Sequence, residues 1–179
     1  HLAAREQRVV MALVQARLGQ HVLDAGCGTG YYARPLIALG CRVTGVDVSP
    51  NMVADARRHG VDASLGDLET CDLPHELDRI VCCGALEFCR DPDRVLARFA
   101  AHLAPGGLCV VLFPLRNVWG SLYRAFHRTH GVQATLFDPA DLSERLRRHA
   151  LVTRASRRVT AFTAVILAER SPSQATPNA

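Results

Sequence analysis

The stretch VLDAGCGTG, residues 22–30, places three glycines within five positions directly behind a short apolar run. The apolar run predicts a buried strand, and the glycines predict a turn from that strand into a helix. Glycine allows positive φ and lets another group approach the backbone where a Cβ would interfere. A turn without a ligand rarely needs so many glycines. We therefore expect Gly26, Gly28 and Gly30 to form a ligand-binding turn.

Runs that predict strands alternate with helical patterns along the chain. This alternation predicts an α/β fold, with a doubly wound, mostly parallel, Rossmann-like sheet of seven strands and helices on both faces. The last two predicted strands follow each other without a helix, so one antiparallel strand must lie near an edge. The predicted helices are 2–18, 31–40, 49–60, 92–103 and 138–150, with Ser49 and Asp138 as N-caps. The predicted strands are 21–26, 41–47, 61–67, 77–85, 106–114, 151–159 and 162–170.

The chain has 179 residues, which is the size of one compact domain. We expect a single domain over residues 1–170, with an N-terminal helix within 1–19 that Gly19 ends. Because the first residue is His rather than Met, we expect that the N-terminus was trimmed. The segment 115–137 is too long for a simple connection and is expected to be an insertion. The end of the chain, SPSQATPNA at 171–179, is expected to be disordered.

Composition argues against several kinds of partner. The formal net charge is +4, and all 21 cationic residues are scattered arginines, so nucleic acid is not an expected partner. No apolar run reaches the length of a membrane span. The seven cysteines lack paired CxxC spacing, and no acidic or histidine cluster has metal-ligand spacing, so we expect no metal. We expect reduced cysteines in a cytoplasmic protein that is a monomer or homodimer.

The glycine spacing distinguishes two kinds of nucleotide-binding turn. A dinucleotide fingerprint is G-x-G-x-x-G, whereas this turn reads G-x-G-x-G. With the Asp before it, the turn resembles the LDxGCGTG motif of the class I S-adenosylmethionine-dependent methyltransferases that act on small molecules. The resemblance extends from Val22 to Pro114, through VTGVDVSPNM, GDLE, LDRIVCCGALEFCRDP and LAPGGLCVVLFP. One departure is Phe88, which stands where the family often has the His of an LEH sequence.

The resemblance implies S-adenosylmethionine as cofactor and S-adenosylhomocysteine as its product. It assigns to Asp24 the orientation of the methionine ammonium, which the backbone carbonyls of Cys27 and Cys82 would face. The three glycines would admit the sulfonium-bearing chain. Asp47, at the end of the second predicted strand, would accept hydrogen bonds from both ribose hydroxyls, because a carboxylate has two acceptor oxygens.

The resemblance also places the adenine ring. Val48 would lie against the ring, with Met52 close by. Asp67, in the GDLE sequence, would accept a hydrogen bond from the adenine amino group, and the Leu68 backbone would bind a ring nitrogen.

The insertion at 115–137 corresponds to a region that lines the acceptor pocket in the family. Its residues 117–130 predict an amphipathic helix with Arg124 and Arg128 on the polar face. The catalytic candidates are Tyr123, His130 and Glu87. The orientation of His130 favours it as a general base, the alternative being that it only caps the helix. Glu87 is either a functional acid or a structural one. The predicted aromatic face comprises Trp119, Leu122, Tyr123, Phe126 and His130.

We predict a methyltransferase that moves the S-adenosylmethionine methyl group to a small-molecule acceptor. Transfer would be an in-line displacement that depends mainly on proximity and orientation. The alternative is a catalytically silent S-adenosylmethionine-binding module that regulates or scaffolds a partner. A nucleic-acid methyltransferase is disfavoured, because the fourth motif lacks an N/D-P-P-Y/F signature.

Overall fold

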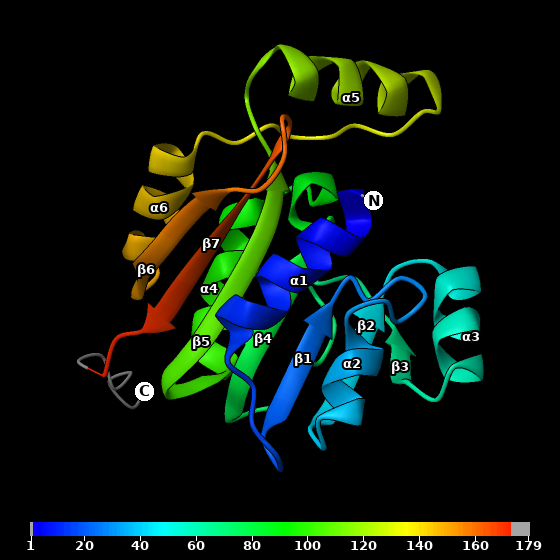
Figure 1. Ribbon diagram of the computed structural model, residues 1–179, viewed down its shortest axis with the longest axis vertical. Helices are drawn as coiled ribbons and strands as arrows, with labels where there is room; N and C mark the ends of the chain where they lie inside the picture. The colour runs from blue at the N-terminus through cyan, green and yellow to red at the C-terminus, as the bar shows by residue number, and fades with distance from the viewer. Residues whose placement is uncertain (1, 173–179) are drawn as a thin grey trace.

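The computed structural model describes residues 2–172 and contains a seven-stranded sheet in the order β3-β2-β1-β4-β5-β7-β6 (Figure 1). β7 runs antiparallel to both of its neighbours, β5 and β6, and the other pairs are parallel. The predicted doubly wound sheet with one antiparallel strand near an edge is therefore confirmed. The strands are β1 (His21–Ala25), β2 (Arg42–Asp47), β3 (Asp62–Leu65), β4 (Leu77–Cys83), β5 (Leu103–Pro114), β6 (Leu151–Arg158) and β7 (Thr163–Arg170).

Helices cover both faces of the sheet, as predicted. Side chains of β5 alternate between the faces, with Cys109 and Val111 in one apolar cluster and Val110 and Leu112 in the other. The first cluster is covered by η1 (Leu86–Phe88), α4 (Pro92–His102) and α6 (Pro139–Arg148). The second is covered by α1 (Leu2–Val14), α2 (Ala33–Ala38) and α3 (Pro50–Arg58).

Two of the predicted helix starts are confirmed by their caps. The Ser49 hydroxyl accepts a hydrogen bond from the Met52 backbone N–H at 3.5 Å, and a proline occupies the first turn of α3. The Asp138 carboxylate accepts one from the Ala140 N–H at 2.9 Å at the start of α6. These side-chain oxygens accept hydrogen bonds from backbone N–H groups of the first turn, which have no carbonyl partner within the helix.

The predicted end of the first helix is wrong. α1 ends at Val14, because Gln15 takes a positive φ of 48° and turns the chain out of the helix. Leu18 is therefore 82% exposed instead of lying on the apolar face of α1. Gly19 belongs to the turn that leads into β1, where its N–H donates to the Gly40 carbonyl at 2.9 Å.

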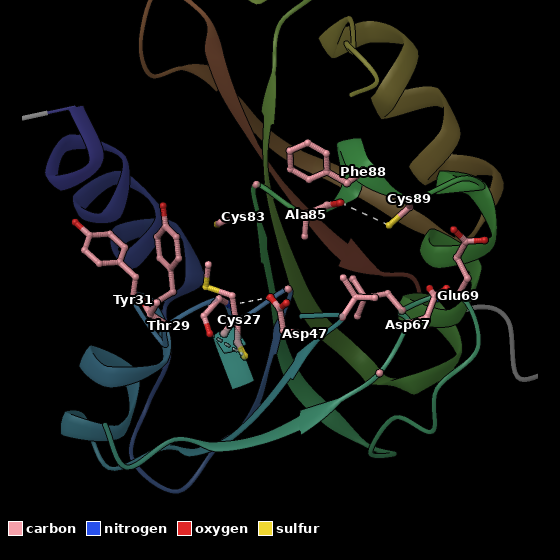
Figure 2. A pocket seen from close by; sticks show the side chains of 18 of the residues that line it. Cys27, Thr29, Tyr31, Asp47, Asp67, Glu69, Cys83, Ala85, Phe88 and Cys89 are labelled. Atoms are coloured by element: carbon pink, nitrogen blue, oxygen red, sulfur yellow. Dashed lines mark hydrogen bonds between the residues drawn. The ribbon is translucent and has the colours of Figure 1, made fainter. Parts of the chain in front are cut away.

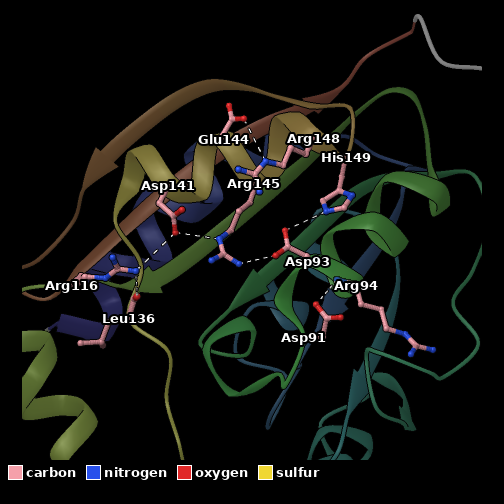
Figure 3. A network of polar contacts seen from close by, with 10 residues as sticks. All are labelled: Asp91, Asp93, Arg94, Arg116, Leu136, Asp141, Glu144, Arg145, Arg148 and His149. Carbon is pink, nitrogen blue, oxygen red and sulfur yellow. Dashed lines mark hydrogen bonds and ion pairs between the residues drawn. The ribbon is translucent and has the colours of Figure 1, made fainter.

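An ion-pair network joins α4 and α6, which lie on the same face of the sheet (Figure 3). Arg145 on α6 lies between Asp93 on α4, at 2.8 Å, and Asp141, at 3.2 Å. His149 Nε2 lies 3.4 Å from the other oxygen of Asp93. These groups are partly exposed, so each pair contributes about 1 kcal/mol or less, and the network mainly fixes how α4 meets α6.

The two ends of the predicted insertion, residues 115–137, lie side by side next to the end of β5. Leu115 and Phe137 form an isolated parallel bridge, and the Arg116 N–H donates to the Phe137 carbonyl at 2.8 Å. Between them α5 (Val118–Thr129) lies beyond the carboxyl ends of the parallel strands (Figure 1). Its N-cap Asn117 and its C-cap His130 coincide with the predicted limits 117–130. The insertion thus places one amphipathic helix above the edge where ligands bind in such sheets.

Residues 173–179, which make up most of the predicted tail, lie outside the described residues. Within the described part, the Ser171 N–H still donates to the Ala150 carbonyl at 2.9 Å. No helix of residues 2–172 is both long enough and apolar enough to span a bilayer. Those residues also contain no group of three or more His, Cys, Asp or Glu side chains suited to a metal ion.

Candidate active site

A cavity of about 630 Å³ opens at the carboxyl ends of β1 to β4 (Figure 2). It lies where the strand order reverses between β1 and β4, which is the usual ligand position in doubly wound sheets. Four loops form its walls, and each loop follows one of these strands. Its lining includes Gly26, Cys27, Gly28, Asp47, Val48, Met52, Asp67, Leu68, Cys83, Gly84, Ala85 and Phe88.

The three glycines of the first turn meet different surroundings. A Cβ on Gly26 would collide with the Ala85 side chain, so this glycine lets the loops after β1 and β4 pack together. A Cβ on Gly28 would meet no atom within 4 Å, and its φ of 51° suits glycine. Gly30 does not line the cavity, and a Cβ there would lie 2.6 Å from Val61. Gly28 therefore keeps the cavity open, whereas Gly26 and Gly30 permit packing.

The carboxylate of Asp47 is fixed at the cavity wall by two backbone N–H groups. Its Oδ2 accepts a hydrogen bond from Gly28 at 2.9 Å, and its Oδ1 accepts one from Ser49, also at 2.9 Å. The first bond connects the turn after β1 to the end of β2 (Figure 2). Each oxygen keeps a further lone pair, so the carboxylate can accept two more hydrogen bonds side by side.

Asp24 and Cys82 lie deeper than the cavity lining. Asp24 is 1% exposed, and its Oδ2 is buried without a hydrogen-bond partner in the described structure. The pKa of Asp24 is raised to about 7, chiefly by burial and also by the nearby Asp47 carboxylate, while a hydrogen bond from the Ala33 backbone lowers it. Cys82 is fully buried in the core cluster on the α4 side, and the next residue, Cys83, lines the cavity instead.

The far wall combines exposed apolar side chains with the loop after β3. Val48 is 73% exposed and Met52 is 43% exposed, and both line the cavity. Asp67 Oδ1 accepts a hydrogen bond from the Glu69 N–H at 2.9 Å, which holds this loop. The Leu68 carbonyl accepts a hydrogen bond from Arg98 Nε at 2.9 Å. This wall offers an apolar surface for a flat ring beside a carboxylate.

A second cavity of about 140 Å³ adjoins the first at Gly84, which lines both. Glu87 lies at this cavity and is 2% exposed. Its Oε1 accepts a hydrogen bond from the Tyr123 hydroxyl at 3.3 Å, and its Oε2 is buried without a partner in the described structure. The pKa of Glu87 is raised to about 7, chiefly by burial and also by the Glu6 carboxylate, while hydrogen bonds from the backbone and from Tyr123 lower it.

The predicted aromatic face of α5 is mostly not turned toward the site. Trp119, Leu122 and Phe126 are 59%, 58% and 62% exposed. The reason is Gly120, the buried residue of the helix, where a Cβ would collide with the Leu115 carbonyl. The helix therefore packs through the face that carries Gly120 and Tyr123, and most of the predicted aromatic face is exposed.

His130 and Tyr123, predicted to project together, lie in different surroundings. His130 is exposed at the C-cap of α5, and its Nδ1 lies 2.9 Å from the Phe126 carbonyl oxygen. It lines neither of the two cavities at the strand ends. His127 is closer to the site, with its ring 4.4 Å from that of Tyr123 and 5.2 Å from that of Phe88. Of the three predicted catalytic residues, Glu87 and Tyr123 come together and His130 does not.

Several lining residues were missed by sequence reasoning. Glu6 on α1 and Phe162 before β7 contribute to the second cavity, although they are far from each other and from Glu87 in the chain. Neither belongs to a motif, so no sequence signal marks them. Glu69 and Tyr31 also line the first cavity; Glu69 is the last residue of the GDLE motif, and Tyr31 directly follows the glycine turn. Their position in or next to these motifs could have marked them as lining residues.

Comparison with known proteins identifies the family. A family profile described as "Methyltransferase domain" matches residues 22–107, which include every loop from β1 to β4 around the cavity. The malonyl-[acyl-carrier protein] O-methyltransferase of Pectobacterium atrosepticum is 34% identical over 129 residues, 70% of this chain and 51% of that protein. The chain belongs to the class I S-adenosylmethionine-dependent methyltransferases.

Other relatives agree with this assignment. The ubiquinone biosynthesis O-methyltransferase of Xanthomonas euvesicatoria pv. vesicatoria is 34% identical over 98 residues, 50% of this chain and 41% of that protein. The chain thus spans about half, or less, of the length of these curated methyltransferases.

Solved structures share the fold of this chain over most of its length. The magnesium protoporphyrin IX methyltransferase of Synechocystis PCC 6803, crystallised with bound S-adenosylhomocysteine, has a TM-score of 0.78 at 19% identity, covering 95% of this chain and 85% of its own. An S-adenosylmethionine-dependent methyltransferase from Mesorhizobium loti has a TM-score of 0.79 at 20% identity, covering 93% and 98%.

Proposed function

We propose that this protein transfers the methyl group of S-adenosylmethionine to a small-molecule acceptor. The observation that carries the proposal is the Asp47 carboxylate, which Gly28 and Ser49 orient at the wall of the larger cavity. A carboxylate held in this way suits a vicinal pair of hydroxyls, and it faces a cavity large enough for a nucleoside with an amino-acid chain.

The residues around the larger cavity fit this cofactor. Asp47 accepts hydrogen bonds from the ribose hydroxyls, and Val48 and Met52 offer apolar contact to the adenine. Asp67 and the Leu68 N–H bind the polar edge of the adenine. Near the methionine end, the unpartnered Oδ2 of Asp24 supports a role in orienting an ammonium from beneath the turn.

The turn after β1 and the loop after β4 complete the cofactor site. Gly28 leaves room for the methionine chain, and Gly26 lets the two loops close together. Gly30 supports the turn through its packing on Val61, and Cys27 contributes backbone to the lining. Cys83 lines the cavity at the end of β4, whereas Cys82 is buried in the core.

The bound sulfonium supplies an activated methyl group, so the protein needs chiefly to align the acceptor and exclude water. Glu87 lies next to the cofactor cavity, and a carboxylate whose pKa is about 7 can accept a proton from an acceptor at neutral pH. Tyr123 holds that carboxylate through its hydroxyl.

We also propose that the protein acts in the cytoplasm as a monomer or homodimer. The seven free cysteines support the cytoplasmic location, because thiols stay reduced there.

The test is calorimetric titration with S-adenosylhomocysteine. Asp47→Ala should weaken binding by roughly 1.5–3 kcal/mol, the scale of charge-assisted hydrogen bonds. Asp62→Ala, at an exposed position on β3, is the matched control and should bind as the unchanged protein does. No binding of S-adenosylhomocysteine, or equal binding by Asp47→Ala, would overturn the proposal. Binding without methyl transfer to any acceptor would favour a regulatory module.

A further inference from the structure

The smaller cavity, next to the cofactor cavity, is acidic and aromatic. Two carboxylates line it, Glu87 from η1 and Glu6 from α1. Among its described lining residues there is no Arg, Lys or His, although the chain carries 21 cationic residues. In the described structure neither carboxylate forms an ion pair, and the Glu6 Oε1 instead accepts a hydrogen bond from the Thr163 hydroxyl at 2.7 Å. The two acids of this cavity thus have no cationic side chain among the described lining residues.

Glu87 has one oxygen that the protein leaves unused. It is 2% exposed, its Oε1 is taken by Tyr123, and its Oε2 is buried with no partner in the described structure. A buried carboxylate oxygen is costly unless a donor or a cation satisfies it. A ligand that brings both an N–H group and a positive charge would satisfy it best.

Aromatic rings complete the walls of this cavity. The rings of Tyr123 and Phe162 lie 6.1 Å apart between centroids and are nearly parallel, at 21°. Phe113 also lines the cavity. Aromatic faces attract organic cations, most strongly when the site excludes water.

We propose that the smaller cavity binds the ammonium group of a small organic amine, and that this amine is the methyl acceptor. The Glu87 Oε2 accepts a hydrogen bond from the ammonium, Glu6 adds attraction, and the rings of Tyr123 and Phe162 contact its carbon substituents. This inference rests on the proposed function and adds the substrate class.

The position of Gly84 explains why a cation held here is close to the reactive end of the cofactor site. This residue follows β4 and lines both cavities, so a ligand in the smaller cavity adjoins the space assigned to the cofactor. An alkylammonium has no lone pair for attack. When it gives one N–H proton to the Glu87 carboxylate, the amine becomes neutral and regains that lone pair, and the carboxylate becomes a carboxylic acid.

The first experiment measures binding of n-butylammonium chloride and of n-butanol, two probes of similar shape that differ in charge. Both are titrated by calorimetry into protein saturated with S-adenosylhomocysteine at pH 7.5. We expect butylammonium to bind at least about tenfold more tightly than butanol. Equal affinities, or no detectable binding of butylammonium, would overturn the assignment of an amine. Loss of S-adenosylhomocysteine binding itself would instead be a failure of the proposed function.

Variants then locate the cation. Glu87→Gln keeps the shape of the side chain and removes the charge, so it should lower butylammonium affinity about tenfold or more and leave butanol unchanged. Glu6→Gln, at the less buried acid, provides a second variant and should cause a smaller loss. Glu144→Gln, on the solvent-facing side of α6, is the matched control and should have no effect. Unchanged butylammonium binding by Glu87→Gln, with S-adenosylhomocysteine affinity also unchanged, would overturn the proposal.

Discussion

The hydroxyl of Tyr123 on α5 donates a hydrogen bond to Oε1 of Glu87 on η1 at 3.3 Å, across 36 residues of sequence. This bond joins the insertion to the loop after β4. The segment between α5 and α6 contacts the same residue, because the Thr135 N–H donates a hydrogen bond to the Glu87 carbonyl at 2.7 Å. Glu87 is therefore fixed through both its side chain and its backbone, and α5 controls the surroundings of the buried carboxyl.

Tyr123→Phe should raise the pKa of Glu87. The hydroxyl stabilises the ionised carboxylate, so its removal favours the protonated form. The measurement is a pH titration of glutamate carboxyl carbons by NMR in labelled protein, with Glu87→Gln identifying the signal. Tyr31→Phe, which lines the larger cavity but not the one that Glu87 lines, is the control and should leave that signal's midpoint in place. A midpoint that stays constant or falls in Tyr123→Phe would contradict the hydrogen bond.

Glu87 should make the protein less stable as the pH rises. Its folded pKa of about 7 lies above the ordinary value of 4.5, so between these values the folded state holds a proton that the unfolded state has lost. Stability from this group is full below pH 4.5 and is lost as the pH rises through about 7. Asp24 has a shift of the same sign.

Glu87→Gln removes this titration. Between pH 5.5 and 8 the wild-type protein should lose on the order of 2 kcal/mol more of its free energy of unfolding than Glu87→Gln does. Urea denaturation at the two pH values measures the difference. Glu144→Gln, whose exposed carboxylate has a lowered pKa from its hydrogen bond with Arg147, should follow the wild type. An equal pH dependence in wild type and Glu87→Gln would show that Glu87 titrates normally.

Alanine at Gly26 and at Gly28 should have different effects. A Cβ at Gly26 collides with Ala85, so Gly26→Ala should lower the free energy of unfolding by about 1–3 kcal/mol. A Cβ at Gly28 meets only the open cavity, so Gly28→Ala should cost about 1–2 kcal/mol of backbone strain and weaken S-adenosylhomocysteine binding. Gly60→Ala is the control, because Gly60 also has positive φ and open surroundings but does not line the cavity. Denaturation and calorimetry on the three variants decide between these outcomes.

The fold and much of the lining of the larger cavity could be predicted because their signals are local in sequence. The apolar period of β5 and the cap at Ser49 each operate over a few residues, and the glycine turn needs only the residues next to it. The position of Asp47 at the cavity wall could be expected because it ends the second predicted strand, whereas its role in binding ribose came from the family resemblance. Gly30 shows the limit of this reasoning, because the packing of Val61 against it depends on how α3 and β3 meet the turn.

The acceptor side could not be predicted in the same way. Helical spacing gives an apolar face to α5 but does not say which side rests on the protein. The contact between Gly120 and the Leu115 carbonyl decides that, and it leaves Trp119 exposed. The second acid of the smaller cavity, Glu6, comes from α1 and meets Glu87 only because the sheet brings α1 beside β5. Such contacts depend on tertiary packing and leave no motif.

The last prediction separates two candidates for the proton acceptor. His130 is exposed at the end of α5 and bonded to its own helix, whereas Glu87 lies beside the cofactor cavity with a free buried oxygen. With an amine acceptor found by screening for methyl incorporation, Glu87→Gln should lower kcat/KM by about 100-fold or more, the contribution of a general base. His130→Gln should stay within about twofold of wild type, since a surface substitution there leaves both cavities intact.

The pH profile provides the second measurement. The wild-type kcat/KM should rise with pH up to about 7, because the Glu87 carboxylate must be ionised to take a proton. That rise should persist in His130→Gln and disappear in Glu87→Gln. If the rise instead disappeared in His130→Gln, the imidazole would be the group that titrates, and α5 would have to bring it over the acceptor during turnover.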